Sequence, residues 1–222
     1  MYEIVFFAGG LGSRLKNSEL LPKPLVDING KTLLSRIINT FEATKLFHKY
    51  HILTCLNSGI YDDLLIKEHS NLDLNIYTEP LRSGRTGALK YFLEENAIIK
   101  KFFVANGDTL FSNLLSNALT SAVNSCKKDI PITFLGKPDP FRNDYLSVKK
   151  NGNDNFQKMQ NSGLFYISRS WLNEKVFVNE ELEDIDYYIY KLNFEIMTYS
   201  LECNLYDAGT PERLMKIRNL IK

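Results

Sequence analysis

The chain has few features that would cross-link it or anchor it to a membrane. Its 222 residues include three cysteines, at positions 55, 126 and 203, which lie far apart and form no CxxC pair. This pattern suggests neither a disulfide framework nor a zinc site, so buried thiols are expected. No run of about 18 apolar residues occurs, and the N-terminus enters a strand pattern without the basic region of a signal peptide. We therefore expect a reduced, cytoplasmic protein that does not bind membranes.

Neither sign of charge is in excess. Lysine and arginine total 27 against 26 acidic residues, a net charge of +1. Such a chain has no long-range field to attract nucleic acid or an anionic membrane, so neither is an expected partner and any cationic site must be local. Histidine is scarce as well. His48, His51 and His69 lie in one stretch away from every glycine-rich segment, and we expect them to be surface or packed residues.

Apolar segments alternate in type along the first half of the chain, which indicates an α/β fold. Strands are expected at residues 2–7, 51–55, 72–78, 101–105 and 130–135, and helices at 32–47, 61–68, 86–95 and 113–123, the last capped by Ser112. Strands that alternate with helices usually form a parallel sheet covered on both faces, with ligands at the carboxyl ends of the strands.

The second half has a different pattern. Turn-rich segments flank strands expected at 145–149 and 163–168, which is typical of antiparallel structure. A late strand at 194–202 precedes a helix opened by Thr210-Pro211-Glu212. We predict one domain over residues 1–222, a Rossmann-like three-layer α/β sandwich with a mixed, mainly parallel sheet.

Residues 8–24, which follow the first strand, read AGGLGSRLKNSELLPKP and carry the most functional information. Small residues let backbone N–H groups approach an anion closely, while Arg14 and Lys23 add two cations. Pro22 and Pro24 restrict the direction of Lys23. The segment has no Gly-Lys-Ser/Thr of a P-loop and no third glycine of a dinucleotide fingerprint. It predicts a phosphate-binding loop of another type.

Two carboxylates follow predicted strands. Asp108 lies in Asn-Gly-Asp after residues 101–105, and Asp207 follows the last strand. Each alone could be a turn residue beside a glycine. Mg²⁺ is commonly held by one or two carboxylates plus phosphate oxygens, so together with the glycine loop the two aspartates favour a metal site.

In this order the three motifs resemble those of the sugar-1-phosphate nucleotidyltransferases, which open with GGxGxR and PKP, carry an acidic residue of the NGD type and end in DxGTPE. The resemblance spans the chain. It implies transfer of a nucleotidyl group from an NTP to a sugar 1-phosphate, with Mg²⁺ as cofactor and pyrophosphate as leaving group, in the synthesis of surface polysaccharides.

The resemblance also implies residue roles. Arg14 and Lys23 would be catalytic, and Asp108 and Asp207 would bind Mg²⁺. Asn161 would contact the sugar, and Lys158 would clamp the sugar phosphate, although its segment FQKM lacks the glutamate of the family's FxEK. The nucleotide would be bound by Ala8, Gly9, Gly10, Gly12, Ser13, Glu79, Gly84, Gly87, Asn106 and Gly107.

One segment departs from the family pattern. Residues 79–88 read EPLRSGRTGA, with two added residues and an arginine in place of a glycine. Arg82 and Arg85 are therefore either phosphate or base contacts or solvated side chains, and the base preference does not carry over.

The length of the chain most resembles the D-glycero-D-manno-heptose 1-phosphate guanylyltransferases, with GTP or CTP as the favoured nucleotide. Cytidylyl-, uridylyl- and thymidylyltransferases acting on another sugar or polyol phosphate share every motif, and the oligomeric state, including a homodimer, stays open. A non-catalytic nucleotide-sugar-binding regulatory protein is the alternative of another class, although it has no need of both aspartates. A dinucleotide-dependent oxidoreductase is disfavoured, because Cys55-Leu56-Asn57 supplies no acid after the second strand.

Overall fold

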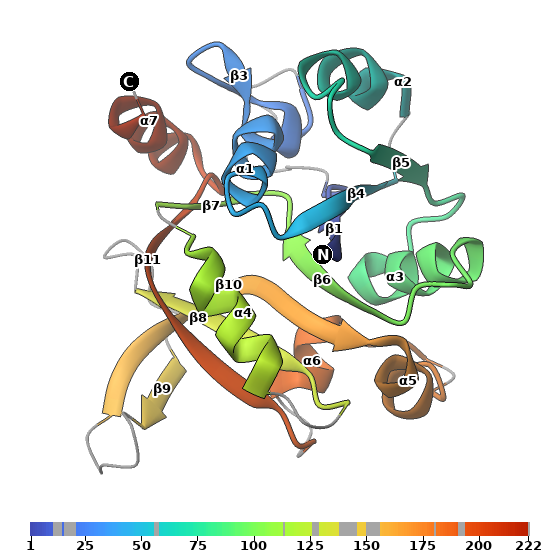
Figure 1. Ribbon diagram of the computed structural model, residues 1–222. Helices are drawn as coiled ribbons and strands as arrows, with labels where there is room; N and C mark the ends of the chain where they lie inside the picture. The colour runs from blue at the N-terminus through green and yellow to red at the C-terminus, as the bar shows by residue number, and fades with distance from the viewer. Residues whose placement is uncertain are drawn as a thin grey trace.

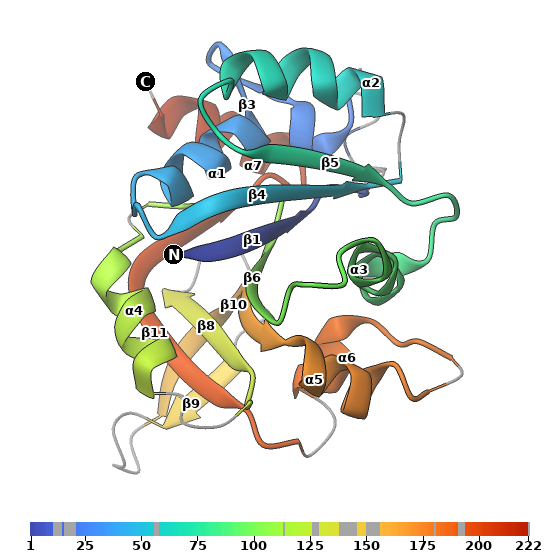
Figure 2. The ribbon, with the colours of Figure 1, turned by 45° about the vertical axis from the view of Figure 1, so that its right-hand side comes forward.

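The computed structural model describes residues 1–10, 15, 21–55, 58–112, 114–125, 129–137, 146–149, 156–179, 181–190 and 194–221. A twisted β-sheet lies at its centre, with strand order β5-β4-β1-β6-β10-β8-β11-β7 and β9 paired to β10 (Figures 1 and 2). The strands are β1 (Tyr2–Phe7), β4 (Phe47–Thr54), β5 (Leu74–Thr78), β6 (Lys101–Asn106), β7 (Thr109–Phe111), β8 (Ile132–Lys137), β9 (Leu146–Lys149), β10 (Phe156–Ser168) and β11 (Met197–Asp207).

The sheet is mixed, as the sequence predicts. Strands β5, β4, β1 and β6 are parallel neighbours, so their carboxyl ends meet at one edge. Strand β10 runs antiparallel to both β6 and β8, and β11 is parallel to β8 but antiparallel to β7. A separate hairpin of β2 (Asp27–Ile28) and β3 (Lys31–Thr32) turns at Asn29 and Gly30, both with positive φ.

Helices cover both faces of the sheet, which confirms the three-layer prediction. One layer holds α1 (Leu33–Glu42), α2 (Ser58–Tyr61) with the π-helical segment η2 (Asp62–Ile66), α4 (Ser116–Ser125) and α7 (Pro211–Leu220). The other holds α3 (Gly84–Glu95), α5 (Arg169–Trp171) with the π-helical segment η3 (Leu172–Val176), and α6 (Ile185–Tyr190). No helix in the described part of the chain has the length and apolar character needed to cross a bilayer.

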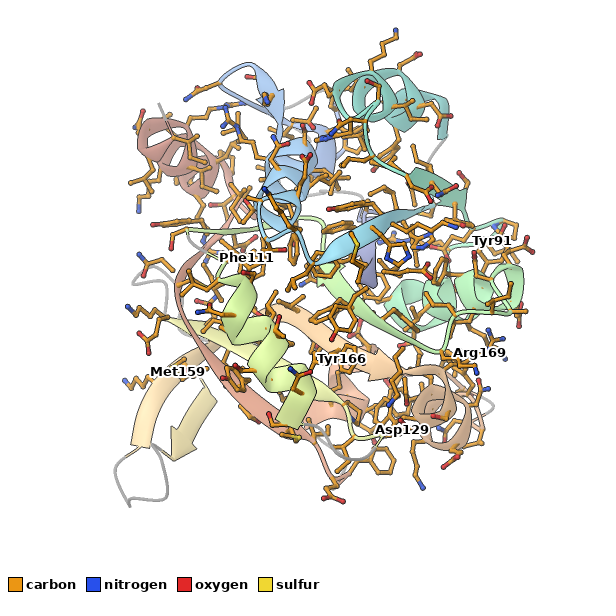
Figure 3. The ribbon with its side chains drawn as sticks, in the orientation of Figure 1. Tyr91, Phe111, Asp129, Met159, Tyr166 and Arg169 are labelled. Atoms are coloured by element: carbon orange, nitrogen blue, oxygen red, sulfur yellow. The ribbon has the colours of Figure 1, made fainter. Side chains whose placement is uncertain are left out.

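Alternation along β1 divides the core between these layers. Ile4 and Phe6 pack with the α1 layer, whereas Val5 packs with the α3 layer, because successive side chains of a strand point to opposite faces. Phe41 of α1 lies edge-to-face against Phe6, Phe47 and Phe111. Figure 3 labels Phe111 and Tyr166, which both belong to the α1-side core.

The predicted helix over residues 32–47 is too long. It begins as expected, because the Thr32 hydroxyl accepts a hydrogen bond from the Ser35 N–H at 3.1 Å. It ends at Glu42, and Lys45 then adopts a φ of 55° before Phe47 opens β4. The apolar spacing continues across this boundary because Phe47 packs into the same core from a strand.

Ser112 does not cap a helix, contrary to the prediction. It pairs with Asn204, donating its N–H to the Asn204 carbonyl at 3.0 Å and accepting the Asn204 N–H on Oγ at 2.9 Å. The short strand β7 before it was not predicted, and helix α4 begins only at Ser116. Strand β11 likewise extends to Asp207, beyond the predicted end at residue 202.

Candidate functional site

The carboxyl edge of the parallel strands carries a cavity of about 480 Å³. Gly9 and Gly10 follow β1, Glu79 follows β5, and Asn106 closes β6. Cavities of this size commonly hold small-molecule ligands. The predicted site residues that line it are Gly9, Gly10, Lys23, Glu79, Gly84, Asn106, Asp108 and Asn161.

Lys23 joins the two predicted metal ligands. It begins the 3₁₀ turn η1 (Lys23–Leu25) between Pro22 and Pro24, and it is almost fully buried. Its Nζ lies 2.7 Å from Asp108 Oδ2 and 2.8 Å from Asp207 Oδ1. A lysine shared by two carboxylates holds them together and neutralises half of their charge.

Pairing of β7 with β11 brings these aspartates together across 99 positions of sequence. Asp207, the last residue of β11, lies opposite Thr109, the residue after Asp108. Gly209 leaves room for the carboxylate, because a Cβ there would lie 2.8 Å from Asp207 Oδ2. The second Asp207 oxygen accepts a hydrogen bond from Arg213 at 2.9 Å.

Arg213 was not identified from the sequence. It lies in the first turn of α7, where the Thr210 hydroxyl accepts its N–H at 3.4 Å. The signal available was its position directly after Thr210-Pro211-Glu212, a helix start that places the next side chains near the preceding strand end.

The donor set suits a hard divalent cation completed by a ligand. Within the described part of the chain, no three His, Cys, Asp and Glu side chains gather that could hold a metal alone. Two carboxylates plus phosphate oxygens and water is a usual Mg²⁺ arrangement. Among the described residues lining the cavity, four acidic side chains outnumber three cationic ones. A polyanion would therefore need further positive charge to bind there.

Several predicted glycines act through close backbone approach. A Cβ on Gly107 would lie 2.7 Å from the Phe7 carbonyl oxygen, which accepts the Gly107 N–H at 2.9 Å. Gly9 contacts Cys55, whose thiol donates to the Gly9 carbonyl at 2.9 Å. Ala8 is fully buried beneath them, whereas Gly10 has open space where a Cβ would be, so a ligand can approach its backbone.

The segment after β5 also lines the cavity, through Glu79, Arg82, Gly84 and Arg85. Glu79 is buried, and its Oε2 accepts hydrogen bonds from the Ser83 hydroxyl at 2.7 Å and the Ser83 N–H at 3.3 Å. Gly84 has a φ of 72°, a conformation that favours glycine. Gly87 is buried outside the cavity, where a Cβ would lie 2.2 Å from the Ser83 hydroxyl.

Arg85 is the centre of a polar cluster that the sequence did not reveal. Its Nε donates to Asp184 Oδ2 at 3.0 Å, its Nη2 to Asp186 Oδ2 at 2.7 Å and to the other Asp184 oxygen, and its Nη1 to Asn106 Oδ1 at 3.2 Å. Burial lowers the pKa of Arg85, but the Asp184 and Asp186 carboxylates outweigh this effect and raise it above its usual value. The only sequence signal was two aspartates flanking the start of an aromatic helix.

Asn161 belongs to the same cluster, through a contact of 3.4 Å from its Nδ2 to Asp186 Oδ1. Lys158 is exposed and does not line the cavity, since alternation along β10 separates it from Asn161, so its role stays a prediction. Gly12, Ser13 and Arg14 lie outside the described residues.

The three histidines play no part in the cavity. His48 is exposed, while His51 and His69 are buried with hydrogen bonds to Glu3 and Ser35 of 2.7 and 2.8 Å. Burial lowers the pKa of both His51 and His69.

Known proteins resemble the chain in sequence and in fold. A family model described as nucleotidyl transferase matches residues 4–195. The bifunctional protein GlmU of Methanococcus aeolicus is 24% identical over a match that covers 73% of this chain but only 39% of that protein. Two crystal structures of HddC from Yersinia pseudotuberculosis, one complexed with GMP-PN, match at 24% identity over 100% of both chains, with TM-scores of 0.77 and 0.78. The inositol-1-phosphate CTP transferase from T. maritima has a TM-score of 0.73 at 16% identity, covering 100% of this chain and 98% of that one.

Proposed function

Because the chain belongs to the nucleotidyl transferase family, we propose that it transfers a nucleotidyl group from a nucleoside triphosphate to a sugar 1-phosphate and releases pyrophosphate. The observation that carries this proposal is that Lys23 and Asp108 line one cavity with Gly9 and Gly10, while Lys23 also pairs with Asp207, which does not line the cavity. A cation and an accessible backbone can contact reacting phosphates directly, and two carboxylates can do so through a bound divalent cation.

The chemistry requires positioning more than covalent participation by the protein. An oxygen of the sugar phosphate attacks the α-phosphorus in line, the bond to the β-phosphate oxygen breaks, and pyrophosphate leaves with that electron pair. The nucleophile is already anionic, so no general base is needed. Lys23 supplies positive charge to the phosphates, and Gly10 offers its backbone to them. Loss of one such preorganised charge contact typically costs roughly 100- to 1000-fold in rate.

Asp108 and Asp207 are the residues that would hold Mg²⁺. Bound there, the ion supplies charge neutralisation for the phosphates. Arg213 holds the Asp207 carboxylate through a 2.9 Å hydrogen bond, and Gly209 avoids the clash that a Cβ would make with it.

For the substrates, we favour GTP and a heptose 1-phosphate. The reaction would take place in the cytoplasm, and its product would serve the synthesis of a surface polysaccharide. Support comes from the full-length likeness to HddC, one structure of which holds GMP-PN. CTP is the second nucleotide to test, because the T. maritima relative is a CTP transferase.

A matrix of nucleoside triphosphates against sugar 1-phosphates, scored by pyrophosphate release with and without Mg²⁺, tests the proposal. We expect turnover in at least one cell of the matrix, abolished by chelation of the metal and by Asp108→Asn. Asp129→Asn is the matched control, because Asp129 also pairs with a lysine, at 2.6 Å, but lies outside the cavity. No consumption of any triphosphate would refute the enzymatic function.

A further inference from the structure

The Arg85 cluster lies at a defined end of the cavity. Along the sheet edge the strands follow in the order β5, β4, β1, β6 and β10. The glycine segment follows β1 in the middle and Glu79 follows β5 at one end. Asp186 contacts Asn161 of β10, and Arg85 contacts Asn106 of β6, so the cluster occupies the end away from β5.

This end is suited to a sugar ring more than to a base. A sugar offers several hydroxyl donors and little apolar surface, so it needs oxygen acceptors in a fixed arrangement. Asp184 already accepts three contacts, two from Arg85 and one from the Asp186 N–H at 3.1 Å. Asp186 receives one strong contact from Arg85, at 2.7 Å, and a weak one of 3.4 Å from Asn161. A carboxylate has about four lone-pair positions, so Asp186 retains acceptor capacity for a ligand.

The cluster also carries an excess of negative charge. One guanidinium faces two carboxylates, and Arg85 fixes both with a fork that a lysine could not reproduce. A ligand group with its own carboxylate or phosphate at this end would meet like charge in a partly desolvated site. Such repulsion is expected to weaken binding on the order of tenfold to a hundredfold.

Resting on the proposed function, we propose that Arg85, Asp184 and Asp186 select the sugar and restrict it to an uncharged, hydroxyl-rich ring, excluding sugars that carry an additional acidic group. Asp186 acts as the hydrogen-bond acceptor for the ring hydroxyls. Arg85 positions Asp186 and sets the net charge of this end of the cavity.

Matched product analogues test this selection, because two nucleotide sugars with the same nucleotide differ only at the sugar. The probes are GDP-mannose against GDP-mannuronic acid, and UDP-glucose against UDP-glucuronic acid, titrated by calorimetry. We expect the native protein to bind the neutral member of each pair at least about tenfold more tightly than the acidic member.

Two variants should change the ratio of the two dissociation constants, that of the acidic member over that of the neutral member, in opposite directions. Asp186→Asn removes the excess charge without changing shape, so the ratio should fall to within about threefold. Arg85→Gln adds to the excess, so the ratio should rise above that of the native protein. A merely structural role would weaken both probes together and leave the ratio unchanged in both variants.

Asp129→Asn is again the control. Asp129 pairs with Lys101, the first residue of β6, which lies about 17 Å along the strand from Asn106 at the cavity end, near α5 (Figure 3). The Asp129→Asn variant should show the same ratio of dissociation constants as the native protein. Equal binding of both members by the native protein, or a shift in the same direction in both variants, would overturn the selection while leaving the proposed function in place. If no nucleotide binds, with or without a sugar, and no pyrophosphate is released, both proposals fall.

Discussion

Replacing Lys23 by methionine should destabilise the protein by removing the cation that Asp108 and Asp207 share. The side chains of Lys23 and Asp207 are only 11% and 12% exposed, against 36% for Asp108. Removing one partner of a buried ion pair typically costs about 3–5 kcal/mol. Asp108 can rehydrate in part and Asp207 keeps Arg213, so we expect about 2–3 kcal/mol, which for a domain of this size lowers Tm by roughly 5–10 °C.

Added Mg²⁺ should separate this explanation from a loss of packing. In the native protein Lys23 occupies the position between the carboxylates, whereas Lys23→Met leaves Asp108 Oδ2 and Asp207 Oδ1 without the lysine ammonium, so that a cation can take its place. A ligand that binds only the folded state raises stability by mass action. Thermal unfolding should therefore show a larger increase in Tm with Mg²⁺ for Lys23→Met than for the native protein, in the absence of any substrate.

Two further variants complete the experiment. Lys101→Met removes a lysine that pairs with Asp129, whose side chain is 52% exposed, and it should cost less than about 1 kcal/mol. Adding Asp108→Asn to Lys23→Met removes the charge of a carboxylate that has lost Lys23, so the double variant should be more stable than Lys23→Met alone. Equal stability of native protein and Lys23→Met, together with equal responses to Mg²⁺, would refute the electrostatic reasoning.

Three other changes have expected outcomes. Gly163→Ala should reduce substrate affinity as well as stability, because Gly163 has a φ of 68° and its new Cβ would lie 2.2 Å from Asn106 Nδ2; unchanged nucleotide-sugar binding by calorimetry would contradict this. The pKa of His69 is lowered by burial, so the folded protein should lose stability as the pH falls below about 6.5, by at most about 1.4 kcal/mol per pH unit from this group. Urea unfolding of the native protein and of His69→Gln measures this, since the variant should lose that part of the slope. Phe41→Ala should cost about 3–5 kcal/mol in urea unfolding, because the ring is fully buried among three aromatic neighbours, and a loss under 1 kcal/mol would mean that the core collapses around the gap.

The sequence predicts the strands and helices of the first half well because their signals are local. The apolar run before Gly9 and the apolar spacing within each helix depend only on the burial of that one segment. Prediction failed where a residue serves two segments at once. Phe47 continues the apolar spacing of α1 yet opens β4, and Ser112 has the chemistry of a helix cap yet pairs with Asn204 of β11.

The residues of the candidate site also fall into those that the sequence predicted and those that it did not. Gly9, Gly10, Lys23 and Asp108 were predicted because glycine loops and acids after strands are recognisable in one segment, and the structure brings them to one cavity. Arg213 and the Arg85 cluster were not, because each of these side chains had many candidate partners. Arg85 contacts Asp184, 99 positions away, and no spacing rule selects that aspartate from the other acids of the chain.

The sequence by itself determined that this protein has a three-layer α/β fold, and it predicted a glycine-rich segment after the first strand and acids after two other strands as the candidate site. These properties depend on residue type and on spacing within a segment. The tertiary structure decided which groups meet: β7 pairs with β11 and sets Asp207 beside Asp108, and α3 faces α6 and sets Arg85 between Asp184 and Asp186. Such contacts depend on strand order and packing, because these bring together side chains that are distant in the chain.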